Sequence, residues 1–185
     1  MKTEVMNMSF AKIIAMITAL LFAGGCGTNT PDDNILDGGN EMVERKEIRS
    51  FCYVHNGSIS YDGYNYTFYR DEIGVHLTAE MNCGWEKLEI DLDDEVMDQL
   101  ETIVYEHRMY SWDGFSKTNS NVMDGEGFSL YIDFMDDTRI SAHGSNAFPE
   151  GYGDAESAFN KIFWDLTEIH ADKIVENDPY DYSDE

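Results

Sequence analysis

The stretch Lys87–His107, KLEIDLDDEVMDQLETIVYEH, contains the point where the chain changes from a two-residue period to a helical one. Leu88 and Ile90 alternate with charged residues, which is typical of a half-buried strand. The apolar positions then recur three or four residues apart, at Val96, Leu100, Ile103 and Val104. Three acids precede them, where a helix N-terminus favours negative charge: Asp93, Asp94 and Glu95. We therefore predict a strand over 87–91 and a helix over Asp93–His107.

Alternating segments lie on both sides of this stretch. The strands predicted upstream cover 50–55, 58–61, 64–70 and 75–81. Asp62-Gly63 lies between two of them and is the strongest hairpin signal of the chain. Downstream we predict strands over 128–134 and 139–143, followed by a helix over Asp154–His170. This order predicts an α+β domain in which an antiparallel sheet of about five to seven strands packs against two helices.

Residues 1–25 have the composition of an export signal. Ile13–Ala23 is an uncharged apolar run of eleven residues. Such a run suits a signal-peptide core of about seven to fifteen residues, and it is too short for a membrane span of about twenty. Gly24, Gly25 and Cys26 follow at once.

This order of apolar core, small residues and cysteine resembles the lipobox of bacterial lipoproteins. Ala23 stands where the lipobox usually has Leu. The resemblance implies that Cys26 is lipidated and becomes the first residue of the mature protein. It also implies a lipid-anchored, extracytoplasmic location in the cell envelope, at the plasma membrane or an outer membrane. The alternative is an ordinary secretory signal that ends beside an incidental cysteine.

Composition divides the rest of the chain into three parts. Residues 26–45 are rich in Gly, Asn, Asp and Thr and are predicted to form a flexible tether. Residues 46–172 carry the periodic segments and are long enough for a single domain. Residues 173–185 are predicted to be a disordered acidic tail.

Charge limits the partners that the chain can bind. Without residues 1–25, ten basic and 36 acidic residues remain, so the net charge is near −26. Nucleic acid and anionic lipid headgroups both require Lys and Arg, and both are excluded as partners on this ground. The membrane contact is therefore predicted to depend on the lipid at Cys26. The acids serve either solubility or the binding of a protein with a basic surface.

Two further cysteines, Cys52 and Cys83, flank predicted strands. Outside the cytoplasm such a pair forms a disulfide, which would add about 3–4 kcal/mol of stability by closing a loop of this length. We predict this disulfide, with two reduced thiols as the alternative.

The second half of the domain contains two unusual loops. Trp112-Asp113-Gly114-Phe115 leads toward the strand FSLYIDF, and Gly144–Pro149 precedes the last helix. This pattern resembles uncharacterised secreted or lipid-anchored proteins of Firmicutes and Bacteroidetes, and the resemblance implies location and fold but no catalytic residue. We predict that Trp112 and Phe115 form an exposed binding loop.

No catalytic residue, cofactor or metal ligand is predicted. The five histidines lie in five separate segments, without the His-x-x-x-His spacing of zinc hydrolases. His143 lies close to Ser145, but no Gly-x-Ser-x-Gly elbow accompanies them. Calcium is a minority alternative, because the acids of 91–95 lack a glycine at the sixth loop position.

These observations predict a non-enzymatic envelope lipoprotein that acts by binding. The alternative is an acidic inhibitor or immunity-type lipoprotein that neutralises a basic protein. A small envelope hydrolase is a third hypothesis.

Overall fold

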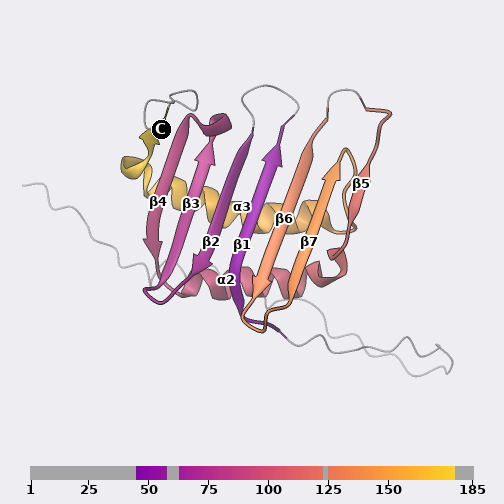
Figure 1. Cartoon of the computed structure of the whole chain (residues 1–185). Coiled ribbons are helices and arrows are strands. Elements are labelled where there is room, and N and C mark those ends of the chain that lie inside the picture. The colour runs from indigo at the N-terminus through magenta and orange to yellow at the C-terminus, as the bar shows by residue number, and fades with distance from the viewer. Residues whose placement is uncertain (1–44, 58–62, 123–124, 178–185) are drawn as a thin grey trace, which may run out of the picture. The chain divides into compact units, whose positions relative to one another are not determined.

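The computed structural model describes residues 45–57, 63–122 and 125–177, which belong to the compact unit Met42–Glu185. The strands are β1 (Ile48–Asn56), β2 (Tyr64–Arg70), β3 (Val75–Met81), β4 (Glu86–Leu92), β5 (Ser116–Thr118), β6 (Gly127–Phe134), β7 (Arg139–Ser145) and β8 (Val175–Glu176). The helices are α2 (Glu95–Glu106) and α3 (Tyr152–Ile169), with 3₁₀ turns η2 (Asn82–Gly84), η3 (Met109–Trp112) and η4 (Ala171–Lys173). Figure 1 shows both helices on the same side of the sheet.

The eight strands form one sheet in the order β5-β7-β6-β1-β2-β3-β4-β8. Neighbours are antiparallel except β5 and β7, which are parallel. The predicted α+β class is therefore confirmed, whereas the sheet is mixed and has more strands than the predicted five to seven. The two additional strands, β5 and β8, have three and two residues and no buried side chain, so they leave no periodic signal. The strand predicted over 58–61 lies outside the described residues.

The core lies between the sheet and the two helices. Alternate side chains of the long strands are buried there, including Phe51, Phe68, Leu77, Leu88 and, in β6, Phe128, Leu130, Ile132 and Phe134. The α2 residues Met97, Leu100 and Val104 and the α3 residues Phe159 and Phe163 complete the core. Both helices begin and end within two residues of their predicted bounds, because long apolar periodicity is a strong signal.

The folded part continues beyond residue 172, which corrects the predicted start of the tail. Val175 pairs with Lys87 and Glu176 pairs with Glu86 in the sheet. Ile174 packs against the core just before this short strand. The segment therefore closes one edge of the sheet instead of beginning a tail.

Gly144 occupies a position in β7 where the backbone of the following turn approaches closely. A Cβ added there would lie 2.0 Å from the Ala147 carbonyl oxygen and 2.8 Å from a ring carbon of Phe128. Its turn partner Asn146 takes the left-handed conformation, with a φ of 53°. The turn therefore requires a residue without a Cβ at 144 and a residue that tolerates a positive φ at 146.

We predict that Gly144→Ala lowers the free energy of unfolding by about 1–3 kcal/mol, because the added methyl group must displace backbone. Denaturant unfolding followed by circular dichroism measures this change. Gly153→Ala in α3 is the control: its Cβ meets nothing within 4 Å. Helix propensity predicts that this control is neutral or more stable. Equal unfolding midpoints for wild type and Gly144→Ala would contradict the close approach.

Candidate functional site

The side of the sheet opposite the helices is here called the open face. Side chains alternate along strands, so this face carries the residues between the buried ones. Its members on the long strands are Ser50, Cys52, Val54, Asn65, Thr67, Tyr69, His76, Thr78, Glu80, Lys87, Glu89, Asp91, Ser129, Tyr131, Asp133, Arg139, Ser141 and His143. Most are half-buried by their neighbours, although no other element covers them in Figure 1.

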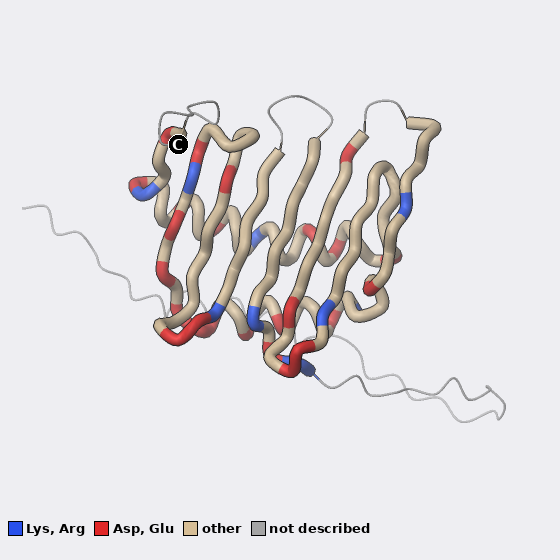
Figure 2. Tube along the Cα trace, in the orientation of Figure 1, with Lys and Arg blue, Asp and Glu red and all other residues tan. Residues whose placement is uncertain are grey.

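Charge is distributed unevenly over the open face. The central strands β1 and β2 contribute uncharged side chains to it, namely Ser50, Cys52, Val54, Asn65, Thr67 and Tyr69. Figure 2 shows that the acids gather at the turns near the start of β1 and along β4. In a chain of net charge −25, the middle of this face is therefore nearly free of charge.

Ion pairs lie at the end of the sheet where β1 begins. Lys46 Nζ lies 2.8 Å from Asp136 Oδ2, and Arg49 Nη2 lies 2.8 Å from Asp137 Oδ1. The Lys46 ammonium group, helped by Thr138, lowers the pKa of Asp136 to about 2. These pairs are exposed and contribute little to stability individually. Each pair neutralises one basic group with one acid, so the two pairs add no net charge where β1 begins.

A pocket of about 280 Å³ lies in the open face over β2, β3 and β4. It is called the β3 pocket. Its side chains on the open face are Tyr69, His76, Thr78, Glu89 and Asp91, and Lys173 of η4 reaches it from the sheet edge. Cross-strand pairing places His76 opposite Asp91 and Thr78 opposite Glu89. The pocket is therefore a product of strand register, with one group added from the C-terminal segment.

His76 is fixed between two carboxylates in this pocket. Its Nδ1 lies 2.8 Å from Asp91 Oδ1, and its Nε2 lies 3.1 Å from Asp71 Oδ1. The ring stacks on Tyr69, with 5.0 Å between centroids. Hydrogen bonds to Asp91 and Asp71 raise the pKa of His76, and backbone N–H groups of Ile73 and Gly74, together with His76, lower the pKa of Asp71.

We predict that His76 titrates above its ordinary pKa of 6.5 and that Asp91→Asn lowers this pKa. Because the folded pKa is the higher one, the stabilisation is fully present below the unfolded pKa. It is lost as pH rises through the folded pKa. An NMR titration of the His76 ring measures both values, with Glu89→Gln as a control that leaves both partners of His76 in place. An unchanged midpoint in Asp91→Asn would contradict the assignment.

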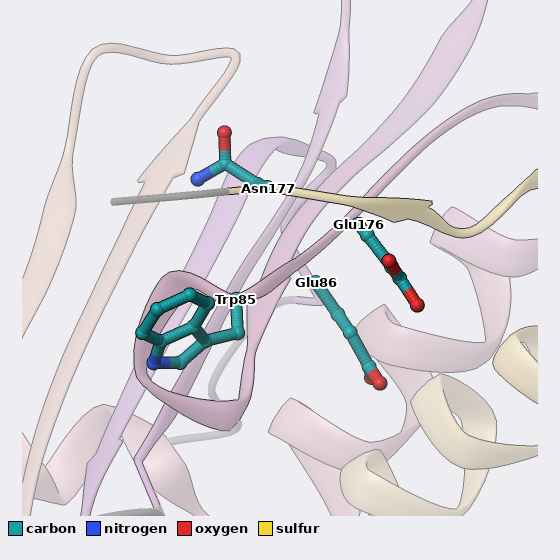
Figure 3. A pocket seen from close by; sticks show the side chains of 4 residues that line it. All are labelled: Trp85, Glu86, Glu176 and Asn177. Carbon is teal, nitrogen blue, oxygen red and sulfur yellow. The ribbon is translucent and has the colours of Figure 1, made fainter. Parts of the chain in front are cut away.

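A second pocket, of about 390 Å³, lies at the edge formed by β4 and β8 and is lined by Trp85, Glu86, Glu176 and Asn177. Glu86 and Glu176 are a cross-strand pair of like charge. Figure 3 shows both carboxylates on the side of the helices, whereas Trp85 points away from them. Asn177 holds this edge, since its backbone N–H donates to the Trp85 carbonyl at 2.7 Å.

The predicted exposed loop at Trp112 and Phe115 is wrong for Trp112. The Trp112 side chain is only 1% exposed, and its Nε1–H donates to the Glu150 carbonyl at 3.1 Å. Phe115 is half-buried against Phe128, with 6.2 Å between the ring centroids. A glycine after the tryptophan suggested an open loop, but the indole fills the end of the core beside Tyr152.

The predicted disulfide is also wrong, since no bond links Cys52 to Cys83. Cys52 lies opposite Thr67 in the sheet, whereas the backbone N–H of Cys83 donates to the Gly63 carbonyl at 2.9 Å. The four residue steps from Gly63 to Thr67 cover about 13 Å of extended chain. A disulfide needs Cα atoms within ~7 Å.

A serine and a histidine at the β5–β7 edge have part of a catalytic arrangement. Ser116 Oγ lies 2.7 Å from His143 Nε2, so the partner of this ring is Ser116 and not the sequence neighbour Ser145. Both side chains are exposed, and among the described residues no carboxylate orients the ring. The pair thus has a nucleophile and a base without the third group of a hydrolase triad.

A buried polar network lies between α3 and the sheet. The hydroxyl groups of Tyr53 and Tyr152 lie 2.6 Å apart and both donate to Glu156 Oε1. Burial raises the pKa of both tyrosines, so both hydroxyls stay protonated. His55 Nδ1 lies 3.8 Å from the same carboxylate oxygen. Sequence reasoning missed this network, because the β1 residues and their α3 partners are about a hundred residues apart in the sequence.

Within the described residues, no group of three or more His, Cys, Asp or Glu side chains is placed to hold a metal ion. None of the helices in the described part is long and apolar enough to cross a membrane. Comparisons with protein-family models, curated proteins and solved structures find no match. The predicted resemblances to lipoproteins therefore stay predictions, and Cys26 lies outside the described residues.

Proposed function

We propose that this chain is a lipid-anchored protein of the cell envelope that acts by binding a partner through the open face. The observation that carries the proposal is the one-sided arrangement of the helices: within the described residues, no helix covers the other face of the sheet. The centre of protein interfaces is depleted in charge and enriched in tyrosine. The uncharged side chains of β1 and β2, with Tyr131 beside them on β6, have this composition.

Location supports the same proposal from the sequence. The apolar core of residues 13–23 and Cys26 indicate export and lipidation. The tether predicted over 26–45 would let the domain turn its open face toward a partner at the membrane. Binding is the function proposed because it needs only a surface and no catalytic residue.

Tyr131→Ala tests the proposed surface. Tyr131 is 47% exposed on the open face, and Tyr105 is 46% exposed on α2, so the two substitutions remove equal side chains of equal exposure. We expect Tyr131→Ala to weaken cross-linked complexes in envelope preparations, whereas Tyr105→Ala leaves them unchanged. The reverse result, or equal losses, would contradict binding through the open face.

The acidic-inhibitor hypothesis is a second candidate with its own observation. Four acids lie at the turns that follow β2 and β4: Asp71, Glu72, Asp93 and Asp94. Arg70 lies beside them and pairs with Asp94. A basic partner at these turns would be released by high salt, because exposed charges are screened. Complexes that survive high salt would reject the electrostatic inhibitor and leave the open-face proposal intact.

A further inference from the structure

We propose that the β3 pocket binds a small zwitterion, a molecule that carries both an ammonium group and a carboxylate, as a free amino acid does. The inference deepens the proposed function and rests on it, because the pocket lies within the open face. It names a ligand class for one part of that face.

The first observation concerns charges that have no ion-pair partner. Glu89 and Lys173 line the same pocket with opposite charges. Seven basic side chains of the described residues form ion pairs, but within this part of the chain neither Lys173 nor Glu89 forms one. No direct ion pair therefore joins the two groups. A ligand between them can satisfy both.

The second observation is that the other charged groups at the pocket already interact with one another. Asp91 and Asp71 both bind the His76 ring, and Tyr69 stacks on that ring. These contacts form a fixed wall, beside which Glu89 is the carboxylate left for a ligand ammonium group. The side chain of Thr78, opposite Glu89 in the sheet, adds a hydroxyl group.

The third observation is that the fold holds Lys173 in place. Its backbone N–H donates to the His170 carbonyl at 2.8 Å, and the next residue, Ile174, packs against the core. The pairing of Val175 with Lys87 then fixes the segment to the edge of β4. The backbone that carries each charge is therefore held by hydrogen bonds, which limits the ordering that binding requires.

Charge and size select the ligand class. A simple anion would be repelled by the carboxylates of Glu89 and Asp91, and a simple cation would be repelled by the ammonium group of Lys173. A zwitterion instead forms a charge-assisted hydrogen bond at each end. The pocket of about 280 Å³ is close to the lower end of the size range of ligand pockets, which suits a small ligand such as an amino acid or a dipeptide. Because the site is open to solvent, we expect a Kd of roughly 1 mM.

Saturation-transfer NMR on the full chain in detergent micelles tests the inference. The probes are L-alanine and L-alanyl-L-alanine, with N-acetyl-L-alanine and L-alaninamide as derivatives that lack one charge. We expect at least one zwitterion to bind and both derivatives to bind at least tenfold more weakly. Equal binding of the derivatives, or no binding of either zwitterion, would overturn the proposal.

Two variants locate the binding. Lys173→Gln and Glu89→Gln should each weaken zwitterion binding about tenfold, whereas Lys161→Gln, the same change on α3, should not. All three side chains are exposed, so folding is expected to persist and a thermal melt verifies it. Unchanged binding in both pocket variants would overturn the assignment. If zwitterions fail to bind while Tyr131→Ala still weakens the complexes, the pocket inference fails and the proposed function stands.

Discussion

Replacing Trp112 with Ala is expected to lower the free energy of unfolding by about 3–5 kcal/mol. The indole is among the largest fully buried side chains, so its removal leaves a cavity that the sheet and helices cannot fill. The substitution also removes the hydrogen bond to the Glu150 carbonyl and the contact with Tyr152, whose ring centroid lies 5.9 Å away. A domain of this size has a total stability of about 5–15 kcal/mol. The loss is therefore a large part of the whole.

Denaturant unfolding of Trp112→Ala and Trp164→Ala measures this effect. Trp164 lies on α3 and is 43% exposed, so its removal deletes the same atoms from a site already in contact with water. We expect a clearly smaller loss in Trp164→Ala. Equal losses, or a Trp112→Ala variant as stable as wild type, would restore the exposed-loop interpretation of Trp112.

Cys26→Ser is expected to move the protein from the membrane fraction to the soluble fraction. Each buried methylene of a lipid chain contributes about 0.8 kcal/mol to membrane binding. The side chains offer no substitute, because the part of the chain after residue 25, with a net charge near −26, is repelled by anionic headgroups. If Cys26 carries the lipid, loss of its thiol should therefore abolish attachment.

Fractionation and intact-mass measurement of the same samples test this prediction. The wild-type mass should exceed that of the processed chain by the mass of the lipid, and Cys26→Ser should lack this difference. Cys52→Ser is the matched control and should stay in the membrane fraction. A Cys26→Ser protein that remains in the membrane fraction, with a mass unchanged from wild type, would contradict the lipid anchor at Cys26.

Local pattern was enough to predict most of the fold. Apolar residues repeat along several turns of α2 and α3 and along β6, and each such segment formed the expected element. The short strands were missed, because Ser116–Thr118 and Val175–Glu176 owe their conformation to pairing with β7 and β4. Tertiary pairing of this kind leaves no periodic trace in two or three residues.

The candidate site depends even more on long-range contacts. Alternation in the strands assigns Thr67 and Tyr131 to the same face, but it does not reveal which face the helices cover. Lys173 and Glu89 line the same pocket only because the segment after α3 pairs with the edge of β4. The disulfide prediction failed for the same reason, since spacing along the chain does not measure distance across strands.

Photo-cross-linking from single positions in the native envelope tests the central claim most directly. A photoreactive residue at Thr67 or Tyr131 probes the open face, and one at Tyr105 or Trp164 probes the side of the helices. If the open face is the binding surface, the same partner is cross-linked from both open-face positions and from neither helix position. Cross-links from the helix positions alone would contradict the claim.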